Sequence, residues 1–84
     1  MPYLIVEYRY DPPLTDEALN ISSAALAPCL EARNVRRLRT YLATDRTRGF
    51  CEFEAADAES VREAFRSAKV KFENVWSADL FGPP

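Results

Sequence analysis

The residues of this chain best suited to chemistry lie in the stretch from Arg36 to Glu54, where arginine, glutamate and aromatic side chains alternate with apolar ones. Arginine binds anionic groups, glutamate acts as a base or ligates cations, and tyrosine donates hydrogen bonds. Strict alternation is the period of a half-buried strand, because successive side chains leave opposite faces of a sheet. We expect a β-hairpin that turns near Asp45 and Arg46.

The hairpin collects the polar side chains on one face of the sheet and the apolar ones on the other. The pairs expected on the polar face are Arg39 with Glu52, Arg37 with Glu54, and Tyr41 with Phe50. The residues expected on the apolar face are Leu38, Leu42, Cys51 and Phe53.

The chain contains no histidine, and this excludes several reaction classes. Serine and cysteine nucleophiles normally need an imidazole beside them, and catalytic zinc sites almost always use one. General acid or base chemistry would therefore fall to Glu, Asp, Lys or Tyr. Cys29 and Cys51 are too few for a disulfide framework and are expected to be small buried hydrophobes.

Length and charge restrict the classes of partner. The chain has 84 residues, a net charge of −2 and a pI near 5.1, so it lacks the basic excess that nucleic acid attracts. A single domain of this size, spanning residues 1–84, buries a smaller share of its surface in its own core than a larger domain does, and dimerisation would increase that share. The first residues contain no signal peptide or membrane segment, and we expect a cytoplasmic protein.

The remaining chain predicts two strands and two helices around the hairpin. Strands are expected over Tyr3–Tyr10 and Phe72–Phe81, and helices are expected to begin at the caps Thr15 and Asp57. The first helix has a predicted core stripe and carries Pro28, which predicts a kink or break near Ala24 to Pro28. The stripe residues are Ala18, Leu19, Ser22, Ala25, Leu26, Cys29 and Leu30.

This order of elements predicts an α+β fold, the ferredoxin-like βαββαβ sandwich, with both helices on one face of a four-stranded antiparallel sheet. Right-handed crossovers place the first and third strands in the middle, so that Glu7 neighbours Glu52 or Glu54. The polar face is then open. We expect two copies to close it as a homodimer, a dimeric α/β barrel with a ligand cavity between the sheets.

Within that cavity a small ligand, anionic and partly aromatic, is expected. Arg39 would pair with its charge, Tyr41 would donate a hydrogen bond, and Ile5 and Phe50 would contact its apolar part. The predicted ligand-binding residues are Glu7, Arg37, Arg39, Tyr41, Phe50 and Glu52.

Four segments carry a resemblance to a known family: PYLIVEY, LTDEAL, VRRLRTYLATD and FCEFEAADAESVREAFRSA. Together they resemble a family of small bacterial domains of unknown function whose best-described member is a nickel-binding protein. The resemblance covers nearly the whole chain, and it implies a dimeric ferredoxin-like protein with nickel as a cofactor.

Two departures bear on the implied nickel. Phe65 stands where relatives often carry a histidine, and Lys69 stands where they usually have glycine. Nickel favours nitrogen and thiolate ligands, and carboxylates alone would bind it weakly. The donors available are Cys51 with Glu7, Glu52 or Glu54, and alternation places Cys51 on the opposite face from these carboxylates. This argues against a shared metal site.

Two other functions stay open. One is a dimeric α/β-barrel enzyme, an isomerase or monooxygenase acting on a small aromatic or lactone substrate, with Glu7 or Glu52 as base and Tyr41 or Arg39 stabilising an oxyanion. The other is a module whose open sheet docks a partner domain. No residue pattern in the chain favours a particular reaction.

Overall fold

The computed structural model describes residues 2–82 and has the expected order of elements, β, α, β, β, α, β. The elements are β1 (Tyr3–Arg9), α1 (Asp16–Ala32), β2 (Arg36–Leu42), β3 (Arg48–Glu54), α2 (Ala58–Ala68) and β4 (Asn74–Ala78). The last strand is shorter than expected at both ends.

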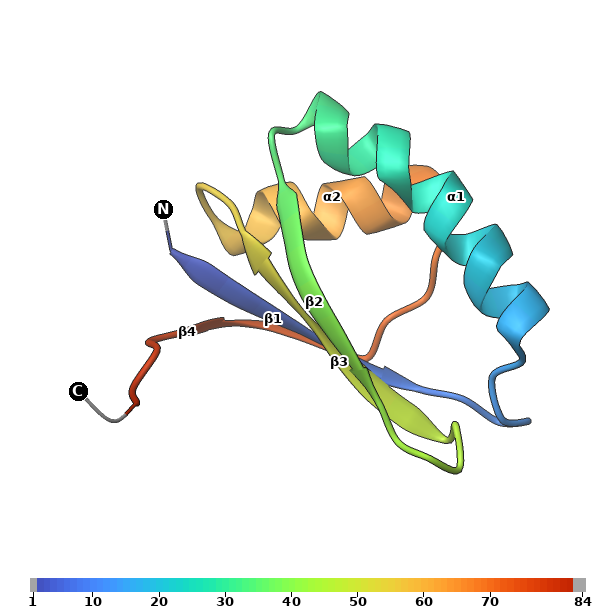
Figure 1. The fold of residues 1–84 in the computed structure, drawn as a ribbon. Helices are drawn as coiled ribbons and strands as arrows, with labels where there is room; N and C mark the ends of the chain where they lie inside the picture. Colours follow the sequence, from blue (N-terminus) through green and yellow to red (C-terminus); the bar gives the residue numbers. More distant parts are fainter. Residues whose placement is uncertain (1, 83–84) are drawn as a thin grey trace.

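The four strands form one antiparallel sheet in the order β2-β3-β1-β4, so the first and third strands are central, as predicted. Both helices lie on the same side of this sheet (Figure 1). The fold is therefore the ferredoxin-like α+β sandwich, with a helix-side face and an open face.

The core lies between the helix-side face and the helices. Alternate residues of β1 and β3 are buried there, as their period predicts. Phe53 of β3 and Phe65 of α2 are fully buried, and their rings meet edge to face with centroids 5.8 Å apart. The largest fully buried side chains are Phe53, Phe65, Leu4, Leu26, Val6 and Val61.

Both predicted helix caps are present. The backbone N–H of Ala18 donates to Thr15 Oγ1 at 3.1 Å, and that of Ser60 donates to Asp57 Oδ1 at 2.7 Å. At the other end of α2, Lys69 adopts the left-handed conformation with φ 58°, the geometry that glycine usually supplies at a helix C-terminus. Its backbone N–H donates to Arg66 O at 3.1 Å. Neither helix of the described residues is long and apolar enough to cross a membrane.

The first helix differs from its prediction in two ways. It continues through Pro28 to Ala32, so of the predicted kink or break the break is absent. Of the seven predicted stripe residues, only Leu26 and Leu30 are buried, while Ala18 and Ala25 are exposed. The period predicts the apolar face of the helix, but only the C-terminal half of that face is buried. In the N-terminal half, Leu19 and Ser22 line a cavity between α1 and the sheet.

Strand β2 contains an irregularity that changes the hairpin. Arg36 lies opposite Glu54 and Arg37 opposite Phe53, but the next pair is Arg39 with Glu52, so Leu38 is the extra residue of a β-bulge. A bulge inserts one residue into a pattern of period two, and every side chain before it changes face relative to a regular strand.

Candidate functional site

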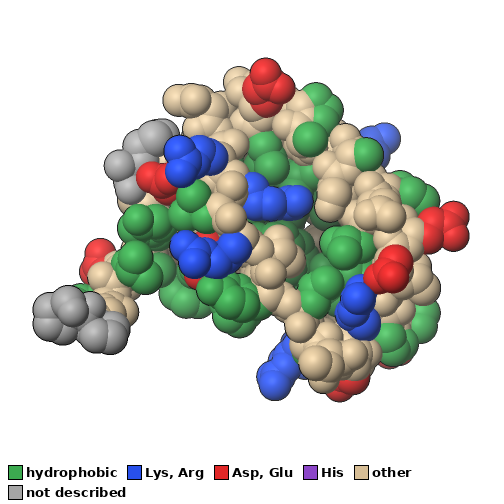
Figure 2. Space-filling model, in the orientation of Figure 1, with side chains coloured by type: hydrophobic (Ala, Val, Ile, Leu, Met, Phe, Trp, Pro, Cys, Tyr) green, Lys and Arg blue, Asp and Glu red, His purple; other side chains and the backbone are tan. Residues whose placement is uncertain are grey.

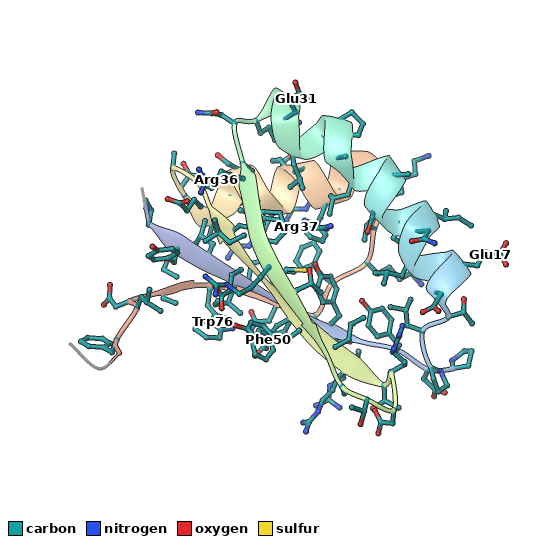
Figure 3. All side chains as sticks on the ribbon, viewed as in Figure 1. Glu17, Glu31, Arg36, Arg37, Phe50 and Trp76 are labelled. Carbon is teal, nitrogen blue, oxygen red and sulfur yellow. The ribbon has the colours of Figure 1, made fainter. Side chains whose placement is uncertain are left out.

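The open face presents a row of exposed aromatic side chains. Tyr41 of β2 and Phe50 of β3 pair across the hairpin as predicted, with ring centroids 5.0 Å apart and exposed fractions of 45% and 42%. Trp76 of β4 is 42% exposed and lies opposite Ile5 of β1. Phe50 and Trp76 project from the side of the sheet away from the helices (Figure 3). Large aromatic side chains on an uncovered sheet mark a surface suited to contact with another molecule.

Charged groups on the same face form two cross-strand ion pairs. Arg39 Nε lies 2.9 Å from Glu52 Oε2, which confirms the predicted pairing. Arg36, and not Arg37, pairs with Glu54, at 3.4 Å between Nη2 and Oε1. Pairs this exposed contribute about 0 to 1 kcal/mol each to stability. A ligand anion at Arg39 would therefore share its guanidinium with the Glu52 carboxylate.

A hollow of about 630 Å³ opens at one end of this face, beside the hairpin. Three of the predicted ligand-binding residues line it, namely Glu7, Tyr41 and Phe50. Glu7 lies opposite Phe50 and Glu52 lies opposite Ile5, so Glu52 is the predicted neighbour of Glu7, placed diagonally on the same face, and Glu54 lies further along β3. The other charged residues lining the hollow are Arg9, Arg48 and Glu73.

The predicted place of Arg37 is wrong. It was expected beside Glu54 on the open face, but the bulge turns it to the helix side, where its guanidinium carbon lies 5.8 Å from the centre of the Phe53 ring. Figure 3 shows Arg37 directed beneath α1, away from Phe50 and Trp76. The six predicted residues are therefore divided: five lie on the open face and one lies behind it.

The sequence predicts that Cys51 is buried on the helix side, but it does not predict the polar cluster that Cys51 forms with Tyr8 and Thr40 near Arg37. The buried Tyr8 hydroxyl donates to Cys51 Sγ at 3.2 Å, and Thr40 Oγ1 lies 2.9 Å from the same sulfur. Burial, followed by the nearby Cys51, raises the pKa of Tyr8 far above its ordinary value near 10, and burial likewise raises the pKa of Tyr10. Tyr8 therefore stays a neutral donor at physiological pH. A tyrosine at a core position of β1 was the available signal, since a buried phenol needs a partner.

The fold and these two faces define a class, the small ferredoxin-like domain with one uncovered sheet face. The profile of the family described as nickel responsive protein SCO4226-like matches residues 3–77, and the chain belongs to this family. The family predicted from the sequence segments is thereby confirmed.

Structural comparison agrees on the fold. The crystal structure of SCO4226 from Streptomyces coelicolor A3(2) matches with a TM-score of 0.83 and 18% sequence identity, over 95% of this chain and 99% of that one. At this identity the match establishes the shared fold and no more. Among curated proteins, no significant match is found.

Proposed function

We propose that the domain is a small homodimeric binding module in which the open faces of two copies pack together and enclose a ligand. The observation that carries the proposal is the exposed aromatic row of Tyr41, Phe50 and Trp76 on a face that neither helix covers. Burying these side chains against a second copy would add apolar contact that an 84-residue domain gains only in part from its own core.

The charges on the open face favour a copy of the same chain as the partner. Arginines and glutamates alternate there, with Arg39 beside Glu52 and Arg36 beside Glu54. In a two-fold interface the same patch meets itself, so a patch must carry both signs to be complementary. A face with one dominant sign would instead repel its copy.

The ligand of this module would occupy the hollow beside Tyr41 and Phe50. The two rings offer an aromatic wall, and Arg9 and Arg48 supply positive charge for an anionic group. This differs from the expectation that Arg39 pairs with the ligand charge, since Arg39 does not line the hollow and its Nε is paired with Glu52. Facing sheets would bring two such hollows into one interface, which is how a shallow hollow becomes an enclosed site.

Nickel enters through the family's description, and the donors of this chain do not fit it. Residues 2–82 contain no group of three or more Cys, Asp or Glu side chains placed to hold a metal ion, and the sequence has no histidine. Cys51 is buried on the helix side with Tyr8 and Thr40 on its sulfur. The function proposed therefore uses no resident metal.

The test is the mass in solution of the wild type and of Phe50→Arg, measured by light scattering after size exclusion. The proposal predicts twice the 9.6 kDa chain mass for the wild type and the chain mass for Phe50→Arg, because a charge in the middle of the aromatic row would be buried without a partner. Ile21→Arg is the matched control, since Ile21 is exposed on α1 and lies away from the sheet.

A wild type that elutes at the chain mass at all concentrations would refute the dimer. Equal loss of mass in Phe50→Arg and Ile21→Arg would show instead that the association does not use the open face. Circular dichroism of both variants checks that each one is folded.

A further inference from the structure

The helix-side face holds a second cavity, of about 600 Å³, between α1, the sheet and the segment from residue 70 to 73. Figure 2 shows the molecule hollowed at this place, with apolar side chains inside and a basic side chain at the edge. Its apolar walls include Leu14, Leu19, Leu26, Leu42, Val70 and Phe72. A cavity of this size and character is typical of small-molecule sites.

Arg37 brings an unmatched positive charge to this cavity. Its Nε atom is buried and has no hydrogen-bond partner, and no carboxylate of residues 2–82 lies within ion-pair distance of it. A buried donor of a charged group that is left unpaired destabilises a protein, and native structures rarely keep one without a reason. An anion in the cavity would supply the missing partner.

Three uncharged polar side chains of the cavity already contact one another. Tyr8 and Thr40 both contact Cys51 Sγ, and burial raises the pKa of Tyr8 so that its hydroxyl adds no negative charge. Tyr10 is stacked on Tyr8 with ring centroids 5.9 Å apart and planes inclined by 13°. The other charged residues lining the cavity, Arg9, Asp11, Lys71 and Glu73, are exposed and carry both signs, so Arg37 with its buried Nε is the cation that lies beside the aromatic surface.

Backbone contacts hold the cavity open. The loop before α1 is attached to the β2–β3 turn, because Leu14 N–H donates to Arg46 O at 2.9 Å and Tyr10 N–H donates to Thr47 O at 2.8 Å. The C-terminal half of α1 is fixed by buried Leu26 and Leu30. Leu19 and Ser22 lie between these two anchored regions, where they are half-buried and line the cavity.

We propose that this cavity binds a small aromatic carboxylate, with its anionic group on the guanidinium of Arg37 and its ring against the apolar and aromatic walls. The site is separate from the hollow of the open face, and it does not depend on the proposed dimer. Arginine is suited to the task because its fork matches both oxygens of a carboxylate.

The test uses 2-naphthoate and its neutral isostere 2-naphthamide as probes, titrated into the ¹⁵N-labelled full chain and followed by NMR. We expect both to shift the amides of α1 and of the 70–73 segment, and naphthoate to bind about tenfold more tightly because only it can pair with the guanidinium. Arg37→Gln should remove this tenfold preference and leave the affinity for naphthamide unchanged.

Two variants make the result specific. Arg39→Gln, on the open face, is the matched control and should keep the preference for naphthoate. Ser22→Phe places a ring in the cavity from α1 and should abolish binding of both probes while the rest of the spectrum keeps its folded dispersion. Equal affinities for the two probes in the wild type, or shifts confined to β2–β3 amides beside Phe50 and to Trp76, would overturn the proposal.

Discussion

The two faces of one sheet differ in how completely the chain satisfies its own side chains. On β3, Cys51 and Phe53 face the helices and are buried, whereas Phe50 and Glu52 face outward and are only partly covered. The helix-side face is mostly apolar, and it borders the cavity in which Arg37 Nε has no hydrogen-bond partner. On the open face Arg39 and Glu52 form an ion pair, while the rings of Tyr41, Phe50 and Trp76 are partly exposed. This difference underlies the two proposals, an anion bound behind the sheet and an apolar surface packed in front of it.

The largest expected effect is a difference in the free energy of unfolding between two alanine substitutions, one on each face of β3. Phe53→Ala should lower the free energy of unfolding by about 3 to 5 kcal/mol, because it leaves a void beside Phe65 in a closed core. Phe50→Ala should lower the stability of the isolated chain by about 1 kcal/mol or less, since its ring is already partly in water. Urea unfolding at low protein concentration measures both values.

The comparison is contradicted if the two substitutions have equal effects at low concentration. At high protein concentration the difference between the two stability losses should become smaller, because Phe50→Ala then also loses the stabilisation that the dimer provides. A difference that does not depend on concentration would argue against self-association through this ring.

A smaller effect comes from Tyr8 at alkaline pH. Burial raises the pKa of the folded Tyr8 above its ordinary value near 10, so the unfolded chain releases this proton first. Stability from Tyr8 is therefore fully present below pH 10 and is lost above it, by at most about 1.4 kcal/mol per pH unit. Tyr8→Phe cannot titrate there.

The measurement for this prediction is the difference in unfolding free energy between wild type and Tyr8→Phe from pH 8 to pH 11. At pH 8 the variant should be less stable, by about 1 kcal/mol, because the hydrogen bond to Cys51 is gone. Above pH 10 the difference should shrink and then reverse. A constant difference would mean that Tyr8 ionises equally in both states, which contradicts its place in the core.

The alternation of apolar and polar residues predicted most of the sheet's two faces correctly, because packing in the core fixes which residues are buried. Leu4, Val6 and Phe53 are buried as their period requires, and the Arg39–Glu52 and Tyr41–Phe50 pairs follow from it. These residues obey the pattern because a shift of one residue would expose the whole core face.

The two failures have a common physical origin in tertiary contacts. The bulge at Leu38 leaves no local mark in RRLRT, where several arginines stand in a row and any of three could face outward. The period of α1 gives the direction of its apolar face but not its distance from the sheet, which depends on tertiary contacts such as the one between Leu14 and Arg46. The position of Arg37 and the helix-side cavity therefore could not be predicted from the sequence pattern.

Trp76, the one tryptophan of the sequence, tests the central claim that the open face is an interface between two copies. Its emission and its quenching by acrylamide are followed as the wild type is diluted through the micromolar range, with Phe50→Arg as the reference for a separated chain. The account predicts blue-shifted, protected emission at high concentration that moves on dilution to the red-shifted, quenchable emission of Phe50→Arg. Identical spectra for the two proteins at every concentration would contradict it.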